Sequence, residues 1–112
     1  MRLLSGQRAW LLQRLTAVYV GVYAVLALGY FVFAAPASHA AWVAVAGHPL
    51  VALPTAVFVF AVLLHAWIGL RDVVMDYVHP LGIRLTVLTL AAGGLALLGL
   101  WAAFILIRTG LA

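Results

Sequence analysis

Residues 15–35 read LTAVYVGVYAVLALGYFVFAA and contain no charged side chain. A helix rises about 1.5 Å per residue, so about 20 apolar residues cross the roughly 30 Å hydrocarbon core of a membrane. Two more stretches have the same character, residues 50–70 (LVALPTAVFVFAVLLHAWIGL) and residues 85–107 (LTVLTLAAGGLALLGLWAAFILI). Because the alternation of period two that marks barrel strands is absent, the sequence predicts an all-α membrane protein. Its three transmembrane helices are expected at about 15–35, 50–75 and 85–107.

The composition of the whole chain agrees with this fold class. Of its 112 residues, 69% are hydrophobic and 7% are charged, whereas a soluble domain carries about 25% charged residues. A soluble enzyme and a nucleic-acid-binding protein are therefore excluded. The chain has no cysteine, so it supplies no disulfide, zinc-thiolate or iron–sulfur ligand. Its length predicts one three-helix membrane domain over residues 1–112.

Arginines mark the ends of the apolar runs and predict the orientation of the chain. Cytoplasmic loops of membrane proteins carry an excess of Lys and Arg. Five of the six arginines fall on one side of the predicted membrane and one on the other, which places the N-terminus in the cytoplasm and the C-terminus outside. Arg2, Arg8 and Arg14 precede the first run, Arg71 and Arg84 lie in the second connection, and Arg108 follows the third run.

Prolines mark the two connections. The first connection runs from Pro36 to Pro49, and we expect Pro49 and Pro54 to lie in or before the first turn of the second helix, where a missing N–H costs little. Pro80 is expected to break the backbone between the second and third helices.

His65 is the one ionisable residue inside the three runs. An ionisable side chain within a membrane span is costly and is by default a candidate functional residue. One interpretation is an interhelical hydrogen bond. The other is an axial ligand to haem iron, because neutral imidazole binds iron without a counter-charge. Ala61 and Gly69, one turn away on either side, leave room either for a flat macrocycle or for a neighbouring helix.

Two carboxylates follow His65 on the same side of the helix if it continues that far. At about 100° per residue, Asp72 and Asp76 fall within roughly 20° of His65, and Asp76 lies about 16 Å further along the axis. Tyr77 comes next. It fits the aromatic belt of the membrane interface, and its phenol also suits a hydrogen bond to a quinone carbonyl, with Asp76 or water relaying protons. Arg71 and Arg84 are expected to neutralise the two Asp residues.

The segment HAWIGLRDVVMDY at residues 65–77 resembles the hydrophobic membrane anchor subunit of succinate dehydrogenase, the small cytochrome b subunit of respiratory complex II. The family pattern is a His, a Gly four residues later, and Asp-Tyr at the end of the second of three helices. The similarity continues into Pro80, Leu81 and Arg84, and the start of the first helix, RLTA at residues 14–17, also looks like the family.

This resemblance implies a set of cofactors and partners. The anchor would pair with a second three-helix cytochrome b subunit and share haem b with it. His65 matches the haem-ligating His, Tyr77 the Tyr that hydrogen-bonds ubiquinone, and Asp76 the acidic residue beside it. Arg14 stands where a basic residue could meet a haem propionate. An iron–sulfur subunit and a flavoprotein subunit would dock on the cytoplasmic face of a bacterial inner membrane.

The residues themselves also bear on where the second axial ligand comes from. His39, His48 and His79 all lie in the predicted connections, so none is well placed to share an iron with His65, and a second chain is expected to supply that ligand. The charged pair Arg71-Asp72 departs from what we expect of the family at that point.

Two other functions remain open from the sequence. In a haem-free structural anchor, His65 would serve only as a packing contact. In a small proton-translocating transporter subunit, His65 and the Asp pair would form a proton path, although broken helices or repeated halves would then be expected. In each case the chain is not catalytic on its own. In the leading interpretation it is one subunit of an oxidoreductase complex that uses a quinone.

Overall fold

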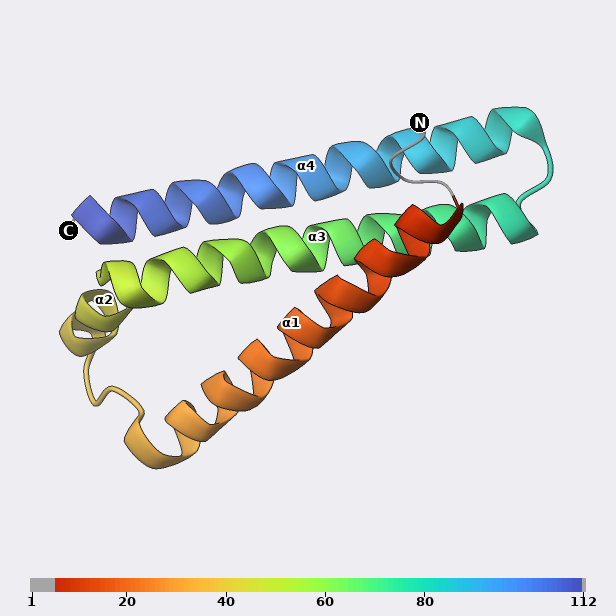
Figure 1. The fold of residues 1–112 in the computed structure, drawn as a ribbon. Coiled ribbons are helices and arrows are strands. Elements are labelled where there is room, and N and C mark those ends of the chain that lie inside the picture. The colour runs from red at the N-terminus through yellow and green to blue at the C-terminus, as the bar shows by residue number, and fades with distance from the viewer. Residues whose placement is uncertain (1–5, 112) are drawn as a thin grey trace.

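The computed structural model describes residues 6–111, and these form helices connected by short turns, with no strand among them. Figure 1 shows the arrangement. The helices are α1 (Gly6–Ala34), α2 (His39–Gly47), α3 (Pro49–Tyr77) and α4 (Leu81–Leu111). Of these, α1, α3 and α4 are long and apolar enough to cross a membrane. The predicted all-α fold with three spanning helices is confirmed.

Helix α3 is the central element of the fold. Helix α4 runs antiparallel beside α3, and α1 lies obliquely against α3 and diverges from it toward its own C-terminal end (Figure 1). The short helix α2 packs against α4 and α3 at the end where α3 begins. Because α3 contacts all the other helices, residues on different sides of α3 face different neighbours.

The spanning helices extend beyond the apolar runs that predicted them, because backbone hydrogen bonding continues into the polar interface. Pro80 does separate α3 from α4, as expected, and Pro49 is the first residue of α3. The expectation for Pro54 was wrong. It lies inside α3, beyond the first turn.

The first connection is not a simple loop, which corrects the expectation for residues 36–49. Ser38 is the N-cap of α2, because its side chain accepts a hydrogen bond from the Ala41 N–H at 3.1 Å. Trp42 of α2 stacks on Phe31 of α1, with ring centroids 5.1 Å apart. These contacts fold the connection back over the end of the helices.

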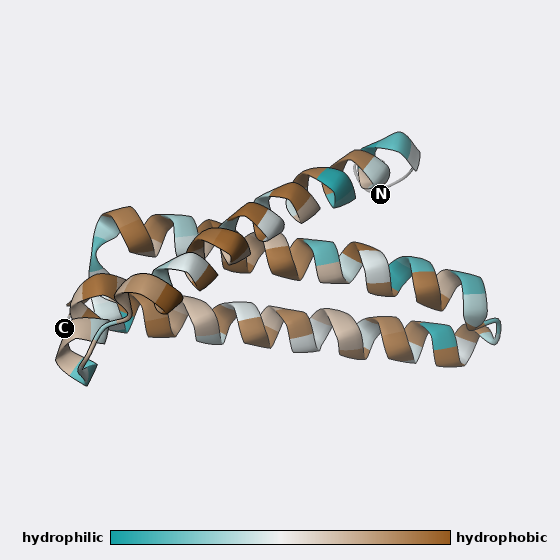
Figure 2. Ribbon diagram, turned by 90° about the horizontal axis from the view of Figure 1, so that it is seen from below, coloured by the Kyte–Doolittle hydropathy of each residue, from teal (hydrophilic) through white to brown (hydrophobic). Residues whose placement is uncertain are grey.

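Very little of the chain is buried against itself. Among the described residues the buried side chains are Ala9, Thr16, Ala61, Ile68 and Val74, and α4 contributes none. Large hydrophobic side chains are exposed along α1, α3 and α4, and Figure 2 shows hydrophobic residues along each of these helices. A helix that is apolar all round is typical of a membrane span, so these surfaces are suited to lipid and to other apolar helices.

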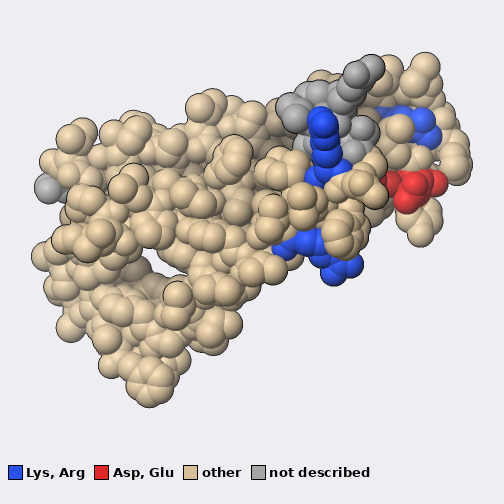
Figure 3. Space-filling view, in the orientation of Figure 1, with Lys and Arg blue, Asp and Glu red and all other residues tan. Residues whose placement is uncertain are grey.

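All the described charged residues except Arg108 gather at the end of the molecule where α1 begins and α3 passes into α4. Figure 3 shows this cluster on one face, with acidic and basic side chains close together. We call this the arginine-rich end; in the described part of the chain it comprises Arg8, Arg14, Arg71, Asp72, Asp76 and Arg84. Arg2 lies outside the described residues. The cytoplasmic location of this end stays a prediction of the charge bias.

The contact between α2 and α4 generates a test. A Cβ added at Gly47 would lie 2.7 Å from the Thr109 carbonyl oxygen, which is backbone and cannot rotate away. We expect Gly47→Ala to lower the stability of the protein by about 1–3 kcal/mol, the usual cost of overpacking. The measurement is the apparent melting temperature of the detergent-solubilised protein.

Gly93→Ala is the matched control, because a Cβ there meets no atom within 4 Å. It should leave the melting temperature unchanged or raise it, since Ala is the better helix former. Equal melting temperatures for Gly47→Ala and Gly93→Ala would show that α2 does not pack on α4 as described.

Candidate functional site

His65 is tied to α1 through one of its two ring nitrogens. Its Nδ1 lies 3.1 Å from the Thr16 hydroxyl oxygen. The same hydroxyl donates to the Leu12 carbonyl at 2.7 Å, and the Gln13 carbonyl lies at 3.1 Å. Because the hydroxyl has one proton and points it at its own helix, its oxygen accepts from His65 Nδ1–H. The imidazole is thereby assigned the tautomer whose Nε2 carries the lone pair.

Nε2 of His65 has no hydrogen-bond partner among residues 6–111. The side chain as a whole is partly buried. The contact with Thr16 therefore satisfies the interhelical hydrogen bond predicted for His65 and still leaves a ring nitrogen that can act as a base or as a metal ligand.

Helix α1 packs close to the small residues around His65. Ala61 is buried, and a Cβ added at Gly69 would lie 3.5 Å from Gln13 Nε2. Ile68, only 1% exposed, is the most buried large side chain of the described chain. Gly69 therefore lies close to α1, in the part of the interface that also holds Gln13.

Thr16 and Gln13 are the residues here that the sequence argument did not single out. Thr16 is 8% exposed and is the buried polar residue of the described part of the chain. Gln13 Oε1 is buried and has no hydrogen-bond partner among the described residues. The two are three residues apart and so share a face of α1. That spacing, at the entrance to the first apolar run, is a signal that could have identified them.

A second polar contact between α1 and α3 lies further from the arginine-rich end. The Tyr19 hydroxyl donates to the Pro54 carbonyl at 2.7 Å, and the Tyr23 hydroxyl lies 2.6 Å from the Thr55 hydroxyl. Tyr23 also stacks on Phe58, with ring centroids 4.2 Å apart. Polar contacts and close packing drive helix association in lipid, so these contacts and the Thr16–His65 bond join the two helices.

The carboxylates and the tyrosine lie at the end of α3. The helix continues to Tyr77, so the condition for placing Asp72 and Asp76 on the side of His65 is met. Asp76 is exposed, and Tyr77 is 78% exposed. Within the described chain nothing packs over this pair, which leaves its surface available to another molecule or to the membrane interface.

The two arginines nearest these carboxylates behave differently. Arg71 pairs with Asp72 at 3.2 Å, as predicted. Arg84 does not pair with Asp76, which corrects the expectation that it neutralises an Asp. Its Nε donates to the Val78 carbonyl at 2.8 Å and its Nη2 to the Met75 carbonyl at 3.3 Å. The last carbonyls of a helix lack intrahelical partners and attract a cation, so Arg84 caps the C-terminus of α3.

The other residues predicted for a site lie away from His65. The Arg14 guanidinium stacks over the Trp10 ring, 5.4 Å from its centroid, and two residues of separation turn Arg14 about 200° away from Thr16 around α1. His39 begins α2, His48 caps α3, and His79 follows α3. No three His, Asp or Glu residues of the described chain gather into a metal site, so a metal here needs ligands from elsewhere.

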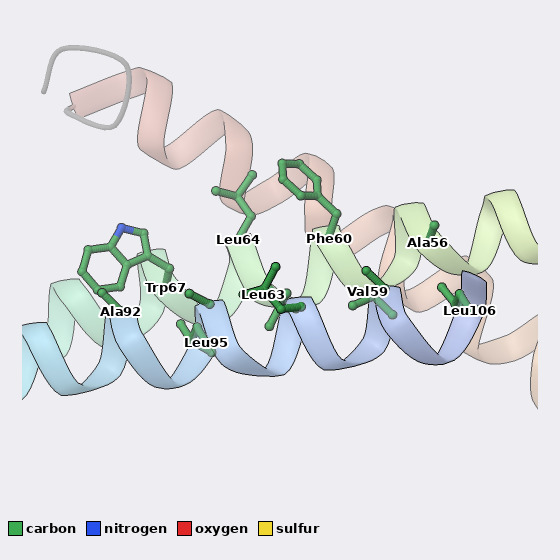
Figure 4. Close-up of a pocket in the computed structure, with 13 residues that line it drawn as sticks. Ala56, Val59, Phe60, Leu63, Leu64, Trp67, Ala92, Leu95 and Leu106 are labelled. Atoms are coloured by element: carbon green, nitrogen blue, oxygen red, sulfur yellow. The ribbon is translucent and has the colours of Figure 1, made fainter. Parts of the chain in front are cut away.

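A groove of about 660 Å³ runs between α3 and α4. Figure 4 shows its apolar lining, including Phe60, Leu63 and Trp67 of α3. A Cβ at Gly99 would lie 2.8 Å from Leu63 Cδ1, so this glycine permits the close approach of α4. None of the candidate site residues lines this groove.

Fold and site together define a small three-span membrane protein. It has one imidazole held between two helices and a carboxylate–tyrosine pair at its charged end. The family model for the succinate dehydrogenase/fumarate reductase transmembrane subunit matches residues 1–107. The succinate dehydrogenase hydrophobic membrane anchor subunit of Coxiella burnetii is 38% identical over 85 residues, which cover 76% of this chain and 74% of that protein.

The chain therefore belongs to the succinate dehydrogenase/fumarate reductase transmembrane subunit family. It is a multi-pass membrane protein, and its function at this level is that of a succinate dehydrogenase membrane anchor subunit. The resemblance inferred from residues 65–77 is confirmed.

The capping role of Arg84 generates a test. We expect Arg84→Gln to fray the last turn of α3, because the Met75 and Val78 carbonyls lose their charged donor. A hydrogen bond worth about 1 kcal/mol corresponds to about fivefold faster amide exchange. The measurement is hydrogen–deuterium exchange of the peptide spanning residues 72–80.

Arg108→Gln is the control, since Arg108 lies in the last turn of α4 at the far end of the chain. It should leave exchange in residues 72–80 unaltered. If Arg84→Gln and Arg108→Gln gave the same exchange as the parent chain, Arg84 would not be the cap of α3.

Proposed function

We propose that the chain supplies one axial ligand of haem b and part of a ubiquinone-reduction site in a succinate:quinone oxidoreductase. His65 binds the haem iron, and a second three-helix cytochrome b subunit supplies the other axial ligand. Asp76 and Tyr77 contribute to the quinone site. Electrons from succinate reach it through an iron–sulfur subunit and a flavoprotein subunit.

The haem proposal is supported by the different environments of the two ring nitrogens of His65. Metal-bound histidines nearly always donate their other ring N–H to an acceptor, which fixes the tautomer and the ring plane. His65 Nδ1 is engaged by Thr16 at 3.1 Å, while Nε2 has no partner among the described residues. A purely structural contact accounts for Nδ1 but leaves Nε2 without a role in an apolar span.

The residues present fit a haem shared between two chains. Porphyrin supplies four iron ligands, so one imidazole from each of two subunits completes the coordination without the three-residue cluster that this chain lacks in its described part. When bound, haem b supplies one-electron redox chemistry. The role of this chain is to hold the Nε2 lone pair of His65 in a fixed position within the apolar interior. Arg14 stays a proposed contact for a propionate group only.

The end of α3 supports the quinone proposal. A phenol can donate a hydrogen bond to a quinone carbonyl, and a neighbouring carboxylate can relay the protons that quinone reduction consumes. Tyr77 and Asp76 are adjacent, exposed and at the polar end of a spanning helix. Asp76 forms no ion pair within the described chain, so no charged side chain there competes for its carboxylate.

The arginine-rich end is the proposed docking face for the iron–sulfur and flavoprotein subunits. The positive-inside bias assigns this end to the cytoplasm, and electrons from soluble subunits then arrive on the same side as Asp76 and Tyr77. Lipid contacts the remaining apolar surface. The location that follows is the inner membrane of a bacterium.

A change at His65 tests the haem proposal. The wild-type complex is expected to show a low-spin b-type haem spectrum, and His65→Ala is expected to change it, because one strong-field axial ligand is lost. The measurement is the optical spectrum of the purified complex in its oxidised and reduced forms.

His39→Ala is the matched control, because that imidazole is exposed at the start of α2. Its spectrum should match that of the wild type. An assembled His65→Ala complex with an unaltered spectrum would exclude His65 as a ligand and favour an anchor in which this residue serves packing alone.

A change at Tyr77 tests the quinone proposal. Tyr77→Phe keeps the ring but removes the hydroxyl, so ubiquinone reductase activity is expected to fall about 10-fold or more. Oxidation of succinate with an artificial acceptor should persist, because that reaction bypasses the site. Tyr30→Phe is the control, because Tyr30 lies near the C-terminus of α1, away from the arginine-rich end. It should leave both activities intact. Equal loss of both activities in Tyr77→Phe would indicate failed assembly and would contradict a role specific to quinone.

A further inference from the structure

The hydroxyl group of Thr16 is an unusual hydrogen-bond acceptor for an imidazole. It lies in a buried side chain of α1, and its proton is committed to carbonyl oxygens of the preceding turn, at 2.7 Å for Leu12 and 3.1 Å for Gln13. The oxygen faces His65 across the interface between α1 and α3. The three groups therefore form one chain, from the Leu12 carbonyl through the Thr16 hydroxyl to His65 Nδ1–H.

Each hydrogen bond in such a chain polarises the next. Donation of the hydroxyl proton to the Leu12 carbonyl raises the electron density on the Thr16 oxygen. The hydrogen bond that this oxygen accepts from His65 Nδ1–H is therefore stronger. A stronger bond at Nδ1 in turn raises the basicity of Nε2 and restrains the plane of the ring. The contact thus acts on the imidazole electronically as well as sterically.

Buried side chains surround the hydrogen bond between Thr16 and His65. Ala61 and Ile68 are buried near His65 on α3, and a Cβ added at Gly69 would lie 3.5 Å from Gln13 Nε2. Thr16 is buried and His65 is partly buried, which limits the access of water to Nδ1–H. The Thr16 oxygen is accordingly the acceptor that the packing of α1 on α3 supplies.

We infer that Thr16 is a positioning residue that orients His65 and lowers the reduction potential of the haem it binds. This inference rests on the proposed function, because it requires His65 to be an iron ligand. A more basic axial imidazole stabilises ferric over ferrous iron, so the hydrogen bond from Nδ1 shifts the potential downward. Thr16 touches neither haem nor quinone and acts only through His65.

The experiment is a redox titration of haem b in the assembled complex, followed by its optical and electron paramagnetic resonance spectra. Thr16→Val replaces the hydroxyl with a methyl group of nearly the same size. It is expected to raise the midpoint potential, so that at the wild-type midpoint the ratio of reduced to oxidised haem rises about fivefold. The spectra should also change, because the ring is no longer held in one plane.

Two further variants separate this effect from a loss of packing. Thr16→Ser keeps the hydroxyl and is expected to keep the potential near that of the wild type. Thr55→Val removes the hydroxyl that contacts Tyr23 between the same two helices, and it should not shift the potential because it leaves His65 untouched. Loss of haem in Thr16→Val but not in Thr16→Ser or Thr55→Val would also support the inference.

Other outcomes overturn the inference. Thr16→Val with the potential and spectra of the wild type would show that the hydroxyl does not act on the ligand. Equal shifts in Thr16→Val and Thr55→Val would show a general effect of helix packing. Neither result touches the proposed function, which fails separately if His65→Ala leaves the haem spectrum unchanged.

Discussion

The absence of water from a bilayer core is the constraint on which this structure depends. Backbone groups in hydrocarbon must be paired within the chain, so each apolar run becomes a helix. Lipid is as apolar as leucine, so the helices gain nothing from hydrophobic burial against one another and associate through close packing and hydrogen bonds. The contact of Thr16 with His65 and those of Tyr19 and Tyr23 with α3 are of this kind.

The same constraint explains why the chain has so little interior. Large apolar side chains remain exposed along α1, α3 and α4. In a soluble protein this surface would aggregate. In a membrane anchor such a surface is suited to lipid and to other apolar helices. The side chains that we propose to be functional lie at the α1–α3 interface and at the arginine-rich end.

The sequence predicted the spanning helices because hydrophobic length is a strong, local signal, and it located His65 because an ionisable residue is rare in such a run. It missed α2, although Ser38 is a recognisable N-cap residue, because the prolines and glycine of that connection indicated turns. It assigned Arg84 to an Asp because pairing of opposite charges is the default. The fold instead brings this guanidinium to the free carbonyls at the end of α3.

The sequence alone could single out Thr16 but could not show which residue it contacts. A threonine in an apolar helix costs little and is common, and its partner lies 49 residues away. Only the oblique packing of α1 on α3 brings the hydroxyl to the imidazole. Helix propensity and periodicity carry no information about which faces of two distant helices meet. Tertiary contacts of this kind therefore cannot be predicted from them.

The central proposal is that His65 Nδ1 is hydrogen-bonded to Thr16 of α1 and that His65 Nε2 binds an iron shared with a second subunit. The measurement that tests it most directly is an electron cryomicroscopy structure of the assembled complex in lipid, at a resolution that places imidazole rings. We predict density with His65 Nδ1 on the Thr16 hydroxyl and Nε2 bonded to haem iron. Density in which Nε2 faces only aliphatic side chains or lipid would contradict it.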